Sequence, residues 1–213
     1  MNHSRWPVAS LALKLLLLRH MQPERTAVDG VQQTGGIAAT AVVRTLILVW
    51  AGYTGFRHLA DPEYFSLLSG VTFGAHEFGH IAFAPFGETL GVVGGSVMQL
   101  LVPLGAAALL GSRRDWTGVA FAACWLAVSM IDLARYVADA RALELPLVSM
   151  SPDGGDHDWN WLLDRSGLLA YDLRIAGVIR RSAAILLLVS LAAGAWHCLQ
   201  ALVSQGRRSP SAA

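Results

Sequence analysis

Three residues around position 80 have side chains and a spacing that could hold a metal ion and activate water. His76, Glu77 and His80 form the pattern His-Glu-x-x-His. Residues four apart lie on one face of a helix, so His76 and His80 can offer two imidazole nitrogens to one ion. Zinc is the usual ion for this arrangement, and the glutamate is placed to take a proton from an activated water. The pattern predicts Zn²⁺ bound by His76 and His80, with Glu77 as the catalytic base.

The segment that carries this pattern is otherwise apolar, from Phe65 to Phe86. Ionisable groups within a membrane-embedded helix are costly and usually functional. The alternative interpretation is a helix whose polar side chains only form hydrogen bonds to their neighbours. A membrane setting favours the metal site over this alternative.

The composition of the whole chain supports a membrane setting. Of its 213 residues, 54% are hydrophobic and only 15% are charged, whereas about a quarter are charged in ordinary soluble domains. The formal net charge is +1, and no basic run interleaved with aromatic residues indicates nucleic-acid binding. We therefore expect an all-α, polytopic membrane helix bundle that contacts the lipid bilayer and no nucleic acid.

Hydropathy divides the chain into three parts. Residues 1–35 form an amphipathic N-terminal segment and linker, residues 36–205 a membrane metallohydrolase domain, and residues 206–213 a disordered tail. The Leu-rich stretch 11–18 could be a signal-peptide core, but Lys14 interrupts it and no small-residue cleavage site follows, which favours an interfacial helix. We expect about five transmembrane helices, at residues 37–56, 65–86, 89–111, 116–137 and 183–203.

An open zinc site needs a third protein ligand, and it must come from elsewhere in the chain. The favoured candidate is His157, in a polar turn where Asp156 and Asp158 flank it and could orient its ring. The carboxylates left open as alternatives are Asp158, Asp156, Asp153, Asp139 and Asp132.

The span 89–111 contains a further polar residue, Gln99, and the pair Gly91 and Gly95. Glycines four apart let helix backbones approach closely in lipid. An amide within a span needs a partner, so we expect Gln99 either to form a hydrogen bond to a substrate backbone or to orient a metal-ligating histidine.

The chain resembles the site-2-protease-like intramembrane zinc metallopeptidases in two features. These are the motif His76-Glu77-Phe78-Gly79-His80 within a predicted membrane span, and the small-residue stretch 91–99 that follows it. That family supplies an aspartate of a Leu-Asp-Gly motif as third ligand. The nearest tripeptides here are Ile131-Asp132-Leu133 and Pro152-Asp153-Gly154.

The chain also resembles small bacterial membrane proteins that combine a His-Glu-x-Gly-His span with two further elements. Those elements correspond to Tyr136-Val137-Ala138-Asp139-Ala140 and to His157-Asp158-Trp159. This second likeness favours His157 as ligand and implies the inner membrane of a bacterial cell.

The leading hypothesis is a multi-pass membrane zinc metallohydrolase, a peptidase that cuts peptide or membrane-protein substrates within or near the bilayer. One alternative is a membrane protein that binds zinc without catalysis. The other is a zinc-dependent hydrolase of lipid amides or esters. The sequence sets no oligomeric state.

Overall fold

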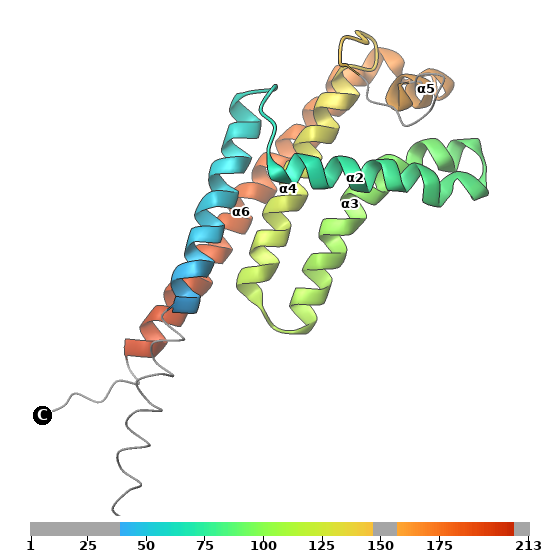
Figure 1. Cartoon of the computed structure of the whole chain (residues 1–213). Coiled ribbons are helices and arrows are strands. Elements are labelled where there is room, and N and C mark those ends of the chain that lie inside the picture. The colour runs from blue at the N-terminus through green and yellow to red at the C-terminus, as the bar shows by residue number, and fades with distance from the viewer. Residues whose placement is uncertain (1–38, 147–156, 207–213) are drawn as a thin grey trace, which may run out of the picture. The chain divides into compact units, whose positions relative to one another are not determined.

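The computed structural model describes residues 39–146 and 157–206, and all regular structure in these ranges is helical (Figure 1). The prediction of an all-α membrane protein is therefore confirmed. The predicted interfacial helix and linker of residues 1–35, and residues 207–213 of the predicted tail, lie outside the described residues. Residues 44–200 form one compact unit, which contains the whole candidate site.

Four helical stretches in the described part of the chain are long and apolar enough to cross a membrane. The last of them combines a short 3-10 turn, η2 (Leu169–Tyr171), with the long helix α6 (Asp172–Gly206). The four stretches are Ala39–Ala60, α3 (Glu88–Ser112), α4 (Trp116–Ala138) and Leu169–Ser204. They give the chain the character of a membrane-embedded protein, with one candidate span fewer than the sequence predicted.

The difference concerns α2 (Leu67–Phe83), the helix that carries the metal-binding pattern. Ser66 caps it, and its helical hydrogen bonding gives way to a 3-10 turn, η1 (Ala84–Phe86), with Pro85 in its first turn. Its 17 residues are about 26 Å long, against about 30 Å for the apolar part of a bilayer. In Figure 1, α2 lies across the direction of α4 and α6.

The turn after α2 folds α3 back onto it. Gly87 has a φ of 107°, a backbone conformation open to glycine and strained for other residues. Because the chain reverses there, α3 packs along α2 and then along α4. This reversal brings Gly91, Gly95 and Gln99 of α3 against the histidines of α2.

Three buried apolar clusters lie among the helices of the described residues, and two of them bear on the site. One joins the first helix, α4 and α6 through Ala51, Cys124, Ala127 and Leu187, all with no exposed surface. The other lies where α5 (Asp158–Arg165) docks on α3 and α4. Its buried members are Leu133, Val137, Ala140, Leu163 and Ala176. Leu163 is the α5 residue in this cluster, so its burial fixes the short helix onto the bundle.

Candidate metal centre

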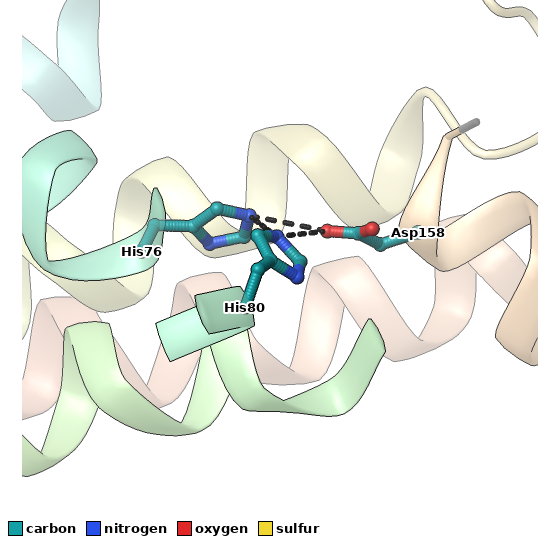
Figure 2. Close-up of side chains that lie close together, drawn as sticks. All are labelled: His76, His80 and Asp158. Carbon is teal, nitrogen blue, oxygen red and sulfur yellow. Dashed lines mark hydrogen bonds and ion pairs between the residues drawn. The ribbon is translucent and has the colours of Figure 1, made fainter. Parts of the chain in front are cut away.

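Three potential ligand atoms from two helices meet at one point (Figure 2). Nε2 of His76 lies 3.0 Å from Nε2 of His80. Oδ2 of Asp158, at the start of α5, lies 3.1 Å from the His76 nitrogen and 3.2 Å from the His80 nitrogen. His76 and Asp158 are buried, and His80 is half-buried. The three atoms form a nearly equilateral triangle.

The hydrogen bonds around His76 fix its tautomer. Nε2 of Gln99 donates to the carbonyl of Ser129 at 3.2 Å, so the amide oxygen of Gln99 faces the other way. That oxygen, Oε1, lies 2.8 Å from Nδ1 of His76 and can only accept. The proton of the neutral imidazole is therefore on Nδ1, and the lone pair of Nε2 points into the triangle.

His80 is oriented in the same way by the backbone of α3. Its Nδ1 lies 2.9 Å from the carbonyl oxygen of Gly91, which can only accept. In the neutral imidazole, Nε2 of His80 therefore also presents its lone pair to the triangle. Ligating histidines commonly use their second nitrogen in this way, because the hydrogen bond fixes both the tautomer and the ring orientation.

Two nitrogen lone pairs and a carboxylate oxygen thus converge, and only a cation between them relieves their repulsion. A proton on one nitrogen can serve, and so can a metal ion. Tetrahedral zinc with bonds of about 2.0–2.1 Å places its ligand atoms about 3.3 Å apart. The separations of 3.0, 3.1 and 3.2 Å are close to this value. The donor set, two imidazoles and one carboxylate, also suits zinc.

The charge of Asp158 is stabilised by the same two imidazoles. Burial by itself raises the pKa of the Asp158 carboxyl, but the contacts with His76 and His80 outweigh burial and hold this pKa below its usual range. Asp158 is therefore ionised at neutral pH. A carboxylate in this state is the form that binds a metal ion.

Asp158 reaches the histidines because the first turn of α5 is held by α3 and by the end of α4. The backbone N–H of Asp158 donates to the hydroxyl of Tyr136 at 3.0 Å. The indole N–H of Trp159 donates to Oγ of Ser96 at 3.0 Å. The side-chain amide of Asn160 donates to the carbonyl of Ala140 at 2.8 Å. Three consecutive residues are thus anchored, which leaves little freedom in the position of the Asp158 side chain.

His157, the third ligand favoured by the sequence, lies next to the triangle but does not face it. It is the N-cap of α5, where its Nδ1 accepts the backbone N–H of Asn160 at 3.2 Å. Its Nε2 lies 3.3 Å from Oδ2 of Asp139, within ion-pair distance but without hydrogen-bond geometry. Its ring packs on Tyr136 with centroids 4.3 Å apart. In this position His157 supports the start of α5.

The other carboxylates considered as ligands are engaged elsewhere or not described. Asp139 accepts the backbone N–H groups of Glu144 and Leu145, at 2.9 and 3.1 Å. Oδ1 of Asp132 lies 3.1 Å from Nδ1 of His58. Asp153 and Asp156 lie outside the described residues.

The absence of a side chain at Gly95 makes room for the ligand atoms. A Cβ at this position would lie 2.5 Å from Nε2 of His80 and 2.8 Å from Nε2 of His76. Real Cβ atoms essentially never come closer than 3.0 Å to another heavy atom. The glycine therefore keeps the ligand-bearing edges of both imidazoles clear, a role beyond the close helix packing that the sequence predicted.

Glu77 lines a cavity that begins beside the triangle. The cavity has a volume of about 310 Å³, and His76, Gln99 and Tyr136 form part of its wall. Glu77 is half-buried, and in the described part of the chain no cation lies within ion-pair distance of its carboxylate. Most of the remaining wall is apolar or aromatic, from Tyr64, Phe65, Phe73, Leu133, Leu145 and Pro146, and its polar part comes from Ser69, Thr72, Asp132 and Arg135. A carboxylate without an ion-pair partner at the edge of such a cavity is available to accept and donate protons.

Comparison with protein-family models, with curated proteins and with solved structures finds no match to this chain. The interpretation of the site depends on its own geometry. The structure brings His76 and His80 together, with Glu77 beside them, and adds Asp158 from among the alternatives. The hydrogen bond from Asp158 to Tyr136 and the room that Gly95 leaves for the ligand atoms were not predicted. Gly95 was predicted only as a helix-packing residue, and Tyr136 only as part of the stretch 136–140 that carries the second resemblance.

Proposed function

We propose that this protein is an integral-membrane zinc metallohydrolase that cleaves peptide bonds, in the manner of the site-2-protease-like metallopeptidases. The observation that supports this proposal most is the convergence of His76 Nε2, His80 Nε2 and Asp158 Oδ2, with both histidine lone pairs directed inward. In this proposal the three residues hold the zinc ion. His157 is assigned a supporting role.

When bound, zinc supplies Lewis-acid chemistry, since it lowers the pKa of a water and polarises a substrate carbonyl. Glu77 takes the proton of the attacking water and returns it to the leaving amine. Gln99 and the Gly91 carbonyl hold the two imidazoles in the required tautomers. The position of Glu77 directly after His76 in α2 places base and ligand on one rigid element.

The substrate in this proposal is a peptide segment of a membrane protein. Its side chains would occupy the largely apolar cavity that Glu77 and His76 line. The four apolar helices place the cavity in a membrane-embedded chain, and the likeness to small bacterial membrane proteins suggests the inner membrane as location. Water from one membrane surface must reach the site, which fits the partial exposure of His80 and Glu77.

The test compares wild type with Glu77→Gln, a substitution of nearly equal size that removes the base. Both proteins are purified in detergent, loaded with zinc and incubated with solubilised membrane proteins. New peptide termini are then identified by mass spectrometry. We expect about one zinc per chain in both proteins, and new termini with wild type alone.

Two results contradict the proposal in different ways. Equal cleavage by the Glu77→Gln variant removes Glu77 from the mechanism. Bound zinc without new termini in either protein favours a non-catalytic zinc-binding role, or lipid amide or ester hydrolysis if lipid products accumulate with wild type alone.

A further inference from the structure

A second polar cluster, buried except for its half-buried aspartate, joins the end of the first helix, the start of α2 and α4. Nδ1 of His58 lies 3.1 Å from Oδ1 of Asp132. Nε2 of the same ring lies 3.0 Å from Oγ of Ser66 and 3.2 Å from Oγ of Ser69. The His58 ring is only 3% exposed. The order carboxylate, imidazole, hydroxyl is that of a catalytic triad, which is recognised by geometry and roles and not by chain order.

The contacts of the two ring nitrogens of His58 support this interpretation. Nδ1 lies within ion-pair distance of Oδ1 of Asp132, and a carboxylate oxygen beside it favours the tautomer with the proton on Nδ1. Nε2 is then an acceptor, and a serine hydroxyl must donate to it. The two hydroxyl oxygens lie 3.2 Å apart, so the second serine can donate to the first. The cluster therefore conducts hydroxyl protons toward Nε2 of His58, as nucleophile activation requires.

We propose that His58, Asp132 and Ser69 form a serine-nucleophile site that takes acyl esters with an apolar acyl chain. Ser69 is the nucleophile because it lines the cavity of about 310 Å³, whereas Ser66 does not. Asp132 lines the same cavity, and the aromatic rings of Tyr64, Phe65 and Phe73 form its wall near Ser69. An apolar chain fits such a wall, and the proposal does not depend on the metal centre.

The chemical step is an acyl transfer. Oγ of Ser69 forms a bond to the ester carbonyl carbon while its proton moves to Nε2 of His58. The carbonyl π pair moves onto oxygen and then returns, which breaks the bond to the alcohol oxygen; the alcohol leaves with the proton from His58. Water then attacks the acyl-serine, loses a proton to His58 and releases the acid, and His58 returns the proton to Ser69.

Stabilisation of the negative oxygen can come from α2 itself. The first N–H groups of a helix have no acceptor within the helix, and here they belong to Leu67 and Leu68. Ser66 already accepts the N–H of Ser69 in the capping box. N–H groups in this position are suited to an oxyanion. Asp132 holds His58 in the required tautomer and is a positioning residue.

The experiment uses a fluorophosphonate with a long alkyl chain, a probe that reacts with activated serines. Full-length protein in detergent is incubated with the probe in EDTA, so that metal chemistry does not contribute, and the adduct is located by peptide mass spectrometry. We expect one adduct per chain, on Ser69, with loss of fluoride and transfer of the hydroxyl proton to His58. Ser69→Ala should abolish it, and Asp132→Asn should slow it at least about tenfold.

Ser112→Ala is the matched control, because Ser112 is exposed at the end of α3 and bonds only to its own helix. It should label as wild type does. No adduct on wild-type Ser69, under conditions that label a reference serine hydrolase, overturns the proposal and leaves the cluster as a helix cap. An adduct that persists in Ser69→Ala overturns it as well. The presence or absence of the adduct on Ser69 of the wild-type protein decides the proposal even if a variant fails to fold.

Discussion

Nδ1 of His76 on α2 lies 2.8 Å from Oε1 of Gln99 on α3, and this contact determines which nitrogen of His76 is free to bind a metal ion. The contact is buried, and the amide orientation is fixed by the Ser129 carbonyl on a third helix, α4. Three helices thus cooperate to direct one lone pair.

Replacement of Gln99 by leucine should weaken zinc binding about 10- to 100-fold, the usual cost of losing the hydrogen-bond partner of a ligating histidine. Gln99→Glu should bind zinc with an affinity between those of wild type and Gln99→Leu, because its carboxylate still accepts the Nδ1 proton but cannot donate to the Ser129 carbonyl. Competition with a chromophoric chelator measures both affinities. Equal affinities for Gln99→Leu and wild type would show that the contact does not orient His76 for binding.

Gly95→Ala should abolish zinc binding, because the added methyl group would lie 2.5 Å from the ligand nitrogen of His80. The matched control is Gly105→Ala, in the same helix, where an added Cβ meets no atom within 4 Å. Elemental analysis gives the zinc content, and thermal unfolding in detergent shows whether each variant folds. A folded Gly95→Ala protein with a full zinc complement would contradict the assigned role of Gly95.

Tyr136→Phe should lower zinc affinity about tenfold without loss of the fold. The substitution leaves the N–H of Asp158 without its acceptor, at a cost of about 1–3 kcal/mol, and so loosens the start of α5. Tyr171→Phe is the control, since Tyr171 is 47% exposed. Chelator competition again provides the measurement, and an unchanged affinity in Tyr136→Phe would show that α5 holds Asp158 without the hydroxyl.

The sequence predicts well the part of the site whose residues are close together in the chain. The relation of His76, Glu77 and His80 depends only on helical geometry, so the spacing was enough. Gln99 was also found from sequence, because an amide in an apolar span needs a partner, and the structure identifies that partner as His76. Hydropathy alone does not separate a membrane-crossing helix from a shorter apolar one, so α2 was counted as a span.

The identity of the third metal ligand illustrates what the sequence could not determine. His157 and Asp158 are adjacent, and either could face the histidines. The structure places Asp158 at the histidines because three contacts anchor the first turn of α5. They come from Tyr136, Ser96 and Ala140, which lie 22, 63 and 20 positions along the chain from the α5 residues that they contact. His157 then serves as N-cap. These are long-range contacts, and neither composition nor spacing encodes them.

The most direct test of the central claim is the zinc content of wild type, Asp158→Ala and His157→Asn. Asparagine is a good N-cap, so His157→Asn removes the imidazole while it preserves the start of α5. We predict about one zinc per chain in wild type and in His157→Asn, and none in Asp158→Ala. Zinc retained in Asp158→Ala and lost in His157→Asn would contradict the claim that Asp158 completes the metal centre.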